Sequence, residues 1–325
     1  MTDKLDSNRL AQLHSILARW DIPPVHSIEP IYHKQHVLHV ISEGQTFTLK
    51  DISDAPNLVR LEFTRDVLTH VARSGLEVPV PLLSRSAQCA ESFEGRYYIL
   101  SKFIEADTSP TAPELQPELF KQTGHAIARL HAALATYPDT DLCRHTWRQD
   151  LAGEAPQWFS ALCDTLPAEQ AAVVKRVRIT REGAIVRALQ NLPEQLIHRD
   201  CHPGNILVQG TRVVGFIDCD HLCIAPRVFD LAYYAVHHLK WVTDDDTATA
   251  RWLTNLPYLF AGYRAQQSLK PAEISALPYA MMAYHLLLAA WFLHNKYSEP
   301  IALELQALDW LDTNFDAVVV ATLSI

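Results

Sequence analysis

Three polar side chains in one stretch of the chain, Asp200, Asn205 and Asp218, have the types and the spacing to bind a metal ion and to move a proton. Short apolar runs at 206–208 and 213–217, separated by a turn, predict a β-hairpin between them. Because the strands of a hairpin lie side by side, the two residues before the first strand and the aspartate after the second can converge at one edge. Carboxylate and amide oxygens suit a hard cation such as Mg²⁺. A spare carboxylate can accept a proton from a hydroxyl group.

The sequence of the first hundred residues predicts a small sheet with one helix, 55–73, between its strands and a further helix, 6–20, before it. Phe47 and Leu49 alternate with polar residues in the run at 45–50, so Lys50 is expected on the face opposite to this apolar pair. Asp54 is a candidate helix cap and Gly75 a candidate helix end. The predicted strands are 28–41, 45–50 and 96–102, with an extended edge at 78–83, and the predicted helices are 6–20 and 55–73.

The rest of the chain is predicted to be mainly helical. A polar run at 105–113, rich in Pro, Ser and Thr, is typical of a joint between lobes. The predicted helices are 119–134, 167–192, 228–240, 248–267, 272–295 and 300–320. We therefore expect an α+β fold of two lobes: residues 1–102 with a small antiparallel sheet and one helix, and residues 103–325 as a larger, mainly helical lobe.

Composition limits the classes of protein that this chain can belong to. With 325 residues, 48% of them hydrophobic, it is long enough for two lobes, and its net charge of −9 argues against nucleic acid as the main partner. Residues 1–19 lack the pattern of a signal peptide, and the longest apolar run, 280–293, is too short to cross a bilayer. The six cysteines lack the spacing of a secreted scaffold. We expect a cytoplasmic protein with reduced thiols and no membrane partner; its oligomeric state stays open.

The central stretch resembles a known family. The run from His198 to Leu207, His-Arg-Asp-Cys-His-Pro-Gly-Asn-Ile-Leu, is similar to the His-Gly-Asp-Leu-His-Pro-Gly-Asn-Val-Leu signature of the aminoglycoside phosphotransferase and choline kinase superfamily. Phe216-Ile-Asp and Asp230-Leu-Ala resemble its Ile-Asp-Trp and Asp-Leu-Ala elements, and Gly124-His-Ala-Ile-Ala-Arg-Leu-His resembles the helix before its catalytic loop. The resemblance covers residues 28–293 and implies the bilobal protein-kinase-like fold.

The resemblance implies phosphoryl transfer from ATP or GTP, with Mg²⁺, to a hydroxyl group of a small molecule. It assigns Asp200 to orient and deprotonate the acceptor, and Asn205 and Asp218 to hold magnesium on the phosphates. By the same resemblance, Lys50 grips the α- and β-phosphates and Glu62 positions it.

Further assignments come from the same family pattern. Ser101, Phe103 and Ile104 resemble the hinge whose backbone meets the nucleotide base. Asp220 is a candidate second metal ligand, because some members carry an acid two positions after the metal-binding aspartate. His198 is expected to brace the loop, and His202, at the loop apex, is expected to contact phosphate or to support the loop. Asp230 is expected to anchor the catalytic loop by accepting backbone hydrogen bonds.

The chain also departs from the family. The stretch between the first two strands, 31–38, has no glycine, although glycine allows the backbone to approach phosphate closely. His33, Lys34 and Gln35 are therefore expected to contact phosphate through their side chains, and the choice between ATP and GTP stays open. Arg199 stands where the small-molecule kinases usually have glycine. It completes a His-Arg-Asp run like that of protein kinases.

The acceptor is not fixed by the motifs. An amine-bearing hydroxyl compound such as homoserine, choline or an aminoglycoside fits a site that contains acids and aromatic rings. The candidates for its lining are Asp244–Asp246, Tyr284, His285, Trp291 and His294, although Leu286–Leu288, Trp291 and Phe292 fit the core of a buried helix better.

Three other interpretations stay open at this point. A protein serine/threonine kinase similar to bacterial stress-response kinases shares the fold and a similar motif. A non-catalytic nucleotide-binding protein is suggested only by the missing glycines. A zinc site is the third; its ligands would come from His198, Cys201, His202, Cys219, His221 and Cys223, although their spacing is unfamiliar.

Overall fold

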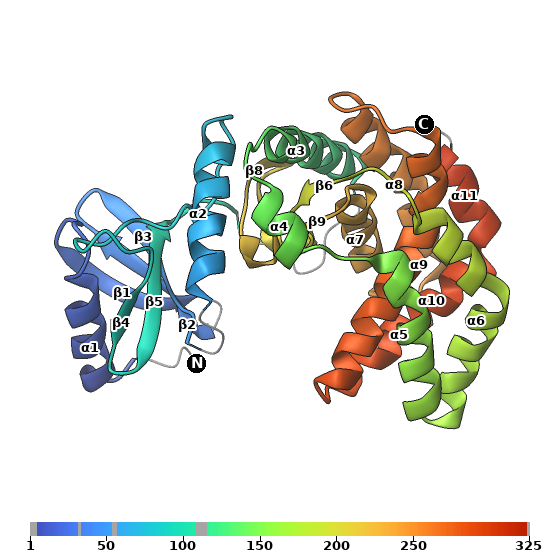
Figure 1. The fold of residues 1–325 in the computed structure, drawn as a ribbon, viewed down its shortest axis with the longest axis horizontal. Helices are drawn as coiled ribbons and strands as arrows, with labels where there is room; N and C mark the ends of the chain where they lie inside the picture. The colour runs from blue at the N-terminus through green and yellow to red at the C-terminus, as the bar shows by residue number, and fades with distance from the viewer. Residues whose placement is uncertain (1–4, 32–33, 54–56, 108–115, 324–325) are drawn as a thin grey trace. The chain divides into compact units, whose positions relative to one another are not determined.

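The computed structural model describes residues 5–31, 34–53, 57–107 and 116–323, and the chain packs into two units. The smaller unit comprises Met1–Ala106 and Gly215–Asp220, and the larger unit comprises Asp107–Val214 and His221–Ile325. The smaller unit contains a sheet with helices, and the larger unit is mainly helical (Figure 1). The predicted α+β class is confirmed. Most of the predicted joint at 105–113 lies outside the described residues.

The sheet of the smaller unit has five strands in the order β1-β2-β3-β5-β4, each antiparallel to its neighbours. The strands are β1 (Val25–Ile31), β2 (Lys34–Ser42), β3 (Gln45–Asp51), β4 (Glu91–Phe93) and β5 (Arg96–Lys102). In this register Lys50 lies opposite Val37 of β2 and Ile99 of β5. The sequence predicted one continuous strand over 28–41, but the chain reverses within it to form β1 and β2.

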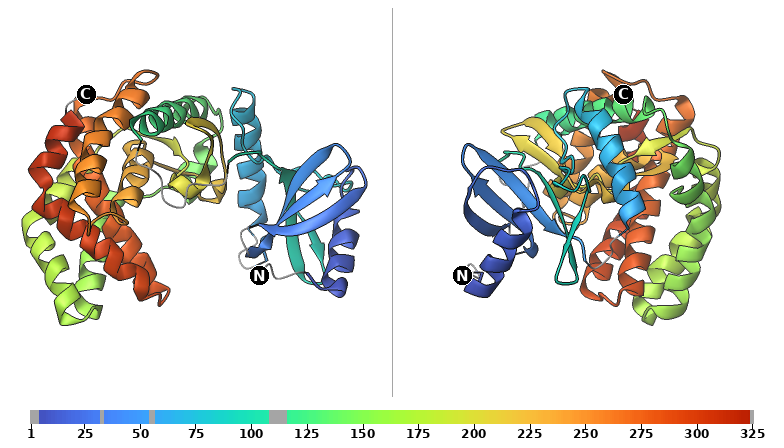
Figure 2. Two further views of the ribbon diagram at one scale, coloured as in Figure 1. Left: turned by 180° about the vertical axis from the view of Figure 1, so that it is seen from behind. Right: turned by 60° about the vertical axis from the view of Figure 1, so that its left-hand side comes forward.

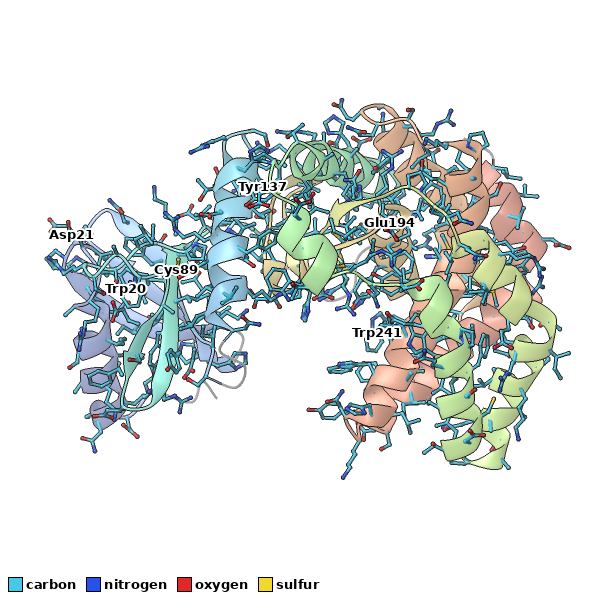
Figure 3. The ribbon with its side chains drawn as sticks, in the orientation of Figure 1. Trp20, Asp21, Cys89, Tyr137, Glu194 and Trp241 are labelled. Carbon is cyan, nitrogen blue, oxygen red and sulfur yellow. The ribbon has the colours of Figure 1, made fainter. Side chains whose placement is uncertain are left out.

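One face of this sheet packs on α1 (Ser7–Leu17) and forms the apolar core of the unit. Leu38, Val40 and Leu49 point to this face, where they meet Leu13 and Trp20. The Trp20 indole donates to the carbonyl of Leu82, at 3.0 Å (Figure 3). Since side chains alternate along a strand, Lys50 lies on the other face, as the sequence predicted.

Helix α2 (Leu58–Ala72) begins after Asn57, whose side chain accepts from the amide of Arg60. The predicted cap, Asp54, lies outside the described residues. The helix buries Phe63, Val67 and other apolar residues. After it the chain runs through the predicted edge at 78–83, which has only an isolated bridge from Pro81 to Ser101.

The segment Gly215–Asp220 packs with the smaller unit although it is distant in sequence. The amide of Phe216 donates to the carbonyl of Glu77, at 3.0 Å. A Cβ at Gly215 would lie 2.6 Å from that same carbonyl oxygen, so only glycine allows this approach. The contact fixes the backbone just before Asp218.

The larger unit combines helices with two short sheets of two strands each (Figure 2). Its sheets pair β6 (Glu194–Ile197) with β9 (Cys223–Pro226) and β7 (Ile206–Gln209) with β8 (Arg212–Phe216), whose last residues belong to the smaller unit. The described helices are α3 (Pro117–Ala135), α4 (Asp141–Thr146), α5 (Leu151–Thr165), α6 (Ala168–Leu189), α7 (Val228–Leu239), α8 (Asp246–Arg264), α9 (Pro271–His294), α10 (Glu299–Thr313) and α11 (Phe315–Leu323). Two short 3₁₀ turns, Pro203–Asn205 and Cys219–His221, carry part of the motif.

Helix α9 is long and apolar enough to cross a membrane, judged by length and composition alone. The apolar run at 280–293, on which the prediction from the sequence rested, is too short for a membrane span. The most apolar part of this helix is 61% buried within the structure. It packs with α7, α10, α5 and α6 (Figure 1). A core helix meets the same test, so this feature gives only weak support for a membrane span.

Candidate active site

In the smaller unit, Lys50 joins the two acids of the second half of the motif. Its Nζ lies 2.8 Å from Oδ1 of Asp218 and 2.5 Å from Oδ2 of Asp220. Burial lowers the pKa of Lys50, but the charges of Asp220 and Asp218 raise it by more, so the pKa of this ammonium lies above its usual value. Lys50 is therefore a permanent cation between two carboxylates.

Asp218 occupies a strained backbone position, with φ at 58°. The Arg60 guanidinium donates to the carbonyl of Asp220, at 2.6 Å, and helps to hold this turn on α2. The two carboxylates are only about half covered, with side-chain exposures of 44% and 46%. Lys50, Asp218 and Asp220 together carry a net charge of −1 and offer carboxylate oxygens, which suits Mg²⁺.

The structure does not bring Glu62 to Lys50. Glu62 is exposed on α2, and among the described residues Lys50 contacts Asp218 and Asp220 instead. Leu61 and Phe63, its neighbours, are buried, so the helix presents the intervening residue to solvent. The positioning role of Glu62 thus stays a prediction without a contact to support it.

The predicted hinge lies at the end of β5. Ser101 is buried opposite Thr48, and the amide of Phe103 donates to the carbonyl of Thr46, at 3.0 Å. This amide is therefore engaged within the sheet, and among the three predicted hinge residues it is not a ready donor to a base. The ring of Phe103 packs on His39, which shares the Lys50 face (centroid separation 4.2 Å). His33 of the predicted phosphate loop lies outside the described residues.

The first half of the motif belongs to the larger unit. The Asn205 amide group donates to both the carbonyl oxygen of Asp200, at 3.0 Å, and its carboxylate, at 2.8 Å. Both contacts use the Asn205 nitrogen, which leaves its amide oxygen as the atom that can bind a metal ion. His198 is fully buried, and its Nδ1 accepts from the amide of Asp200. The predicted bracing role of His198 is confirmed.

Asp230 anchors the loop at 198–205, which the family resemblance assigns to catalysis, as the sequence predicted. This loop is called the catalytic loop below. Its fully buried carboxylate accepts from the backbone amides of His198, at 3.0 Å, and Arg199, at 2.8 Å. His131 Nε2 lies 2.9 Å from the same carboxylate. Burial raises the pKa of Asp230, but the hydrogen bond from His131 and the neighbouring groups lower it by more, so the carboxyl stays ionised. This network holds Arg199 at its positive φ of 72°.

An aromatic group beside the catalytic loop was not predicted in this role. Tyr233 of α7 stacks on Tyr284 of α9, with ring centroids 4.4 Å apart, and the Tyr284 hydroxyl donates to the carbonyl of Arg199. His202 stacks on His237, also of α7, with centroids 5.1 Å apart. The available sequence signal was the Tyr-Tyr-Ala-Val-His-His run directly after Asp230-Leu-Ala.

Of the predicted acceptor-lining residues, only Tyr284 contacts the catalytic loop directly. Asp245 caps α8 through the amides of Thr247 and Ala248, which is a structural role. His285 is fully buried and its Nδ1 lies 2.7 Å from Glu304. Trp291, which fits a buried core in the sequence, is 52% exposed.

The zinc interpretation gains no support. Within the described ranges no three His, Cys, Asp or Glu side chains gather as a metal-binding group. Cys201, Cys219 and Cys223 are buried. Asp218 and Asp220 offer two carboxylates in one turn, and oxygen ligands of this kind are those that Mg²⁺ prefers.

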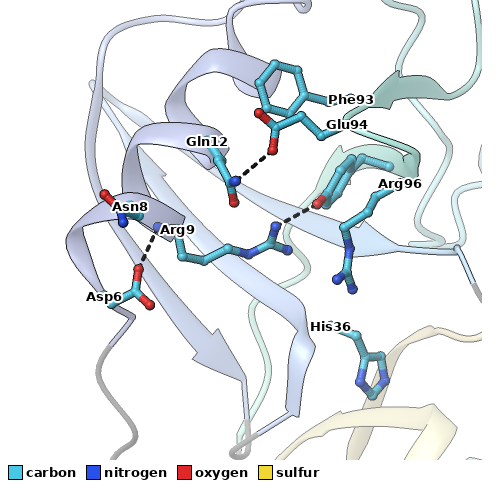
Figure 4. Close-up of a pocket in the computed structure, with 9 residues that line it drawn as sticks. Asp6, Asn8, Arg9, Gln12, His36, Phe93, Glu94 and Arg96 are labelled. Atoms are coloured by element: carbon cyan, nitrogen blue, oxygen red, sulfur yellow. Dashed lines mark hydrogen bonds between the residues drawn. The ribbon is translucent and has the colours of Figure 1, made fainter.

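A cavity of about 610 Å³ lies in the smaller unit, away from Lys50 (Figure 4). Its walls come from α1, from the β4–β5 hairpin and from His36 of β2. Arg9 donates to the Tyr98 hydroxyl, at 2.9 Å, and Arg96 pairs with Asp51, at 2.6 Å. Arg9 thus joins α1 to the sheet, whereas Arg96 joins β5 to the end of β3.

Comparison with known proteins agrees with this geometry. Residues 27–270 match the phosphotransferase enzyme family. The chain is 29% identical over 255 residues to a homoserine kinase of Methylorubrum populi, a match that covers 77% of this chain and 73% of that protein. It is 27% identical over 278 residues to a homoserine kinase of Brucella anthropi, covering 82% and 78% of the two chains.

Solved structures show the same fold. A microcompartment-associated aminopropanol kinase superposes with a TM-score of 0.72 at 17% identity, covering 95% of this chain and 98% of its own. An aminoglycoside phosphotransferase from Alicyclobacillus acidocaldarius superposes with a TM-score of 0.69 at 15% identity, covering 96% and 95%. The kinase-like fold and the aminoglycoside phosphotransferase resemblance are thereby confirmed, and the function predicted from the motif, a small-molecule phosphotransferase, is supported. The chain belongs to the phosphotransferase enzyme family.

Proposed function

We propose that this protein uses ATP and Mg²⁺ to phosphorylate the hydroxyl group of a small amino alcohol, with homoserine as the first candidate. The observation that carries this proposal is the Asp200 carboxylate, which the Asn205 amide holds at 2.8 Å on a loop anchored by buried Asp230. A carboxylate held in place beside an oxygen-donor group is what acceptor deprotonation and phosphate alignment require. The homoserine kinase relatives support the choice of acceptor.

In the proposed reaction Asp200 orients the acceptor hydroxyl and accepts its proton as the acceptor oxygen bonds to the γ-phosphorus. The bond from that phosphorus to the bridging oxygen breaks, and the nucleoside diphosphate leaves. Lys50 neutralises charge on the nucleotide phosphates. The amide oxygen of Asn205 and the carboxylates of Asp218 and Asp220 would hold Mg²⁺, which supplies positive charge to the phosphates when it is bound. The Asp218 carboxylate is held by the Lys50 ammonium, at 2.8 Å, on a backbone with φ at 58°.

The charges around Asp200 support an amine-bearing acceptor. Burial and the charge of Lys240 lower the pKa of His237 to about 2, so this imidazole is neutral at physiological pH. Lys240 itself is paired with the buried Glu304 carboxylate, at 3.1 Å. Asp200 and Arg199 are charged groups that act on Tyr233, whose ring stacks on Tyr284, and the buried Asp230 carboxylate adds a second negative charge near Tyr284. An ammonium group suits such a surface.

The test is ATP and GTP consumption with Mg²⁺ in the presence of homoserine, aminopropanol, choline, an aminoglycoside and a generic protein acceptor. We expect stimulation by homoserine and identification of its phosphate ester by mass spectrometry. Labelling of protein alone would replace this proposal with a protein kinase. Nucleotide binding without turnover on any acceptor would favour a non-catalytic nucleotide-binding protein, and consumption of GTP alone would correct the choice of ATP.

A further inference from the structure

Helices α3 and α8 approach each other closely at two glycines. A Cβ at Gly124 of α3 would lie 1.9 Å from the carbonyl oxygen of Leu259, and a Cβ at Gly262 of α8 would lie 2.0 Å from that of Lys121. The two backbones can come this close only because neither glycine has a side chain. Tyr263 follows Gly262 directly and is fully buried. The close approach therefore places a tyrosine of α8 in the interior of the larger unit.

The hydroxyl of this tyrosine meets the last residue of the Gly-His-Ala-Ile-Ala-Arg-Leu-His run. The Tyr263 oxygen lies 2.9 Å from Nδ1 of His131, and the two rings meet edge-on with centroids 5.6 Å apart. His131 stands two helical turns after Gly124, so both residues lie on the α3 face that meets α8. The histidine is as completely buried as the tyrosine, so bulk water does not compete for this hydrogen bond.

The other ring nitrogen of His131 reaches the anchor of the catalytic loop. Nε2 lies 2.9 Å from Oδ2 of Asp230. The same carboxylate accepts from the backbone amides of His198, at 3.0 Å, and Arg199, at 2.8 Å. A continuous chain of hydrogen bonds therefore runs from Tyr263 through His131 and Asp230 to the backbone of the catalytic loop.

Arg227 holds the far end of this chain. Its guanidinium carbon lies 5.8 Å from the centroid of the Tyr263 ring, and its Nε pairs with the buried Glu273 carboxylate, at 2.7 Å. Arg227 directly precedes α7 and stands three residues before Asp230. One arginine thus contacts the tyrosine and fixes the start of the helix that carries the anchor.

The positions of the protons follow from the acceptor at the end of the chain. An ionised carboxylate only accepts hydrogen bonds, so the nitrogen that faces Asp230, Nε2 of His131, carries a proton. In a neutral imidazole the other nitrogen is then an acceptor and needs a donor. Burial raises the pKa of Tyr263 by more than the charge of Arg227 lowers it, so the phenol keeps its proton and donates it to the hydrogen bond with Nδ1.

We propose that Tyr263 is a positioning residue, which fixes the tautomer of His131 and, through it, the Asp230 carboxylate that holds the catalytic loop. This inference rests on the proposed function, which assigns the loop to phosphoryl transfer. No bond to Tyr263 or His131 is made or broken in the reaction. Both keep their protons while the proton of the acceptor moves to Asp200.

The first test is the protonation pattern of His131 in the full-length protein, read by nitrogen-15 NMR of labelled imidazoles at neutral pH. The His131 signals are assigned by their loss in His131→Gln, which keeps a donor toward Asp230. We expect a proton on Nε2 and a bare, hydrogen-bonded Nδ1, whose signal moves to that of an unbonded nitrogen in Tyr263→Phe. A proton on Nδ1 in the wild-type chain, or an unmoved signal in the variant, would overturn the inference.

The second test compares amide hydrogen exchange in Tyr263→Phe and Tyr98→Phe. Tyr98 is a matched control, because it is also buried and also makes one 2.9 Å hydrogen bond, from Arg9 in the smaller unit. Each change removes one hydroxyl and keeps the ring, so both variants are expected to fold with similar stability, which thermal unfolding checks. We expect the amides of His198 and Arg199 to exchange about 3- to 20-fold faster in Tyr263→Phe alone. Equal exchange in the two variants contradicts a positioning role.

Turnover gives a third readout. Tyr263→Phe should lower kcat by about 3- to 20-fold and leave the KM for ATP within about twofold, whereas Tyr98→Phe should change neither by more than about twofold. In a His131→Phe background the chain is already broken, so Tyr263→Phe should cost no further kcat; losses that multiply would show that the tyrosine acts by another route. Absence of any transfer by the wild-type chain would contradict the proposed function, and the NMR and exchange results would still decide whether Tyr263 positions the loop.

Discussion

At the scale of single residues, the two halves of the motif belong to different units, and the proposed function gives proton transfer to one half and nucleotide binding to the other. Asp200 belongs to the loop held by Asn205, whereas Asp218 lies 2.8 Å from Lys50 in the other unit. We expect Asp200→Asn to lower kcat by about 10² to 10⁴-fold, since a general base is lost, and to leave the Kd for nucleotide nearly unchanged. Asp218→Ala should instead weaken Mg²⁺-dependent nucleotide binding. Calorimetric titration beside steady-state kinetics checks both, and full activity of Asp200→Asn would show that the base is misassigned.

Asp230 acts on the same loop from behind. Its buried carboxylate accepts from two backbone amides and faces His131. In Asp230→Asn one carboxylate oxygen becomes an NH₂ donor, so this side-chain nitrogen would face another donor or a backbone amide would lose its acceptor. We expect a loss of about 3 kcal/mol in the free energy of unfolding, measured with urea, together with lower kcat. The control is Asp150→Asn at the exposed cap of α5, where asparagine caps equally well and only a few tenths of a kcal/mol should change.

The sequence predicted the residue types at the site better than their partners. Asp200, Asn205 and Asp230 follow from the motif, because the loop is short and its contacts are local or directly anchored. The partners of Lys50 do not follow from the motif. The direction of Glu62 depends on how Leu61 and Phe63 of α2 pack, and this packing leaves Glu62 exposed. Tyr233 could not be separated by sequence from its neighbour Tyr234, which packs on Phe120, since one residue of helical rotation decides which tyrosine lies beside His202.

At the scale of elements, glycines set how closely α3 and α8 approach. A Cβ at Gly124 would lie 1.9 Å from the carbonyl oxygen of Leu259, and both helices would have to separate. We expect Gly124→Ala to lower the free energy of unfolding by about 1 to 3 kcal/mol or more. Gly183→Ala is the matched control, because its Cβ would meet only the flexible Arg187 side chain, at 3.1 Å. Chemical unfolding should show a gain of about 0.5 to 1 kcal/mol for that control; a similar loss in both would contradict the packing argument.

Long helices and alternating strands were predicted where the pattern is periodic. Helix α7 was expected at 228–240 and lies at Val228–Leu239, and β5 was expected and found at 96–102. Strands β6 and β9 were not predicted, because each has four residues and their pairing joins Glu194 to Pro226, which no local pattern reveals. The predicted helix at 300–320 is interrupted at Asn314, where α10 ends and α11 begins.

At the scale of the whole molecule, buried neutral histidines make stability depend on pH. Burial lowers the pKa of His238 to about 3, and burial with the charge of Lys240 lowers that of His237 to about 2. An unfolded histidine titrates near pH 6.5, so below that value unfolding takes up a proton at each position that the folded chain does not bind. The contribution of these two histidines to the free energy of unfolding is therefore fully present above pH 6.5. It decreases steadily as the pH falls toward 3. Ionised buried acids such as Asp230, whose pKa is lowered, add their own loss only below about pH 4.

The window between pH 6.5 and 5 thus reports on the histidines of α7. We expect the free energy of unfolding to fall by roughly 2 kcal/mol for each of the two residues between pH 7 and pH 5, measured by urea unfolding at several pH values. His238→Phe keeps the packing against Phe120 and removes a ring whose Nε2 has no partner within the described part of the chain. This variant should lose about half of the pH dependence and gain stability at pH 5, because one proton fewer is taken up on unfolding. His26→Phe, at an exposed position, is the control and should leave the slope unchanged. If His238→Phe kept the full slope, protonation of the unfolded chain at this position could not be the cause, and the acid sensitivity of the fold would have to come from other groups.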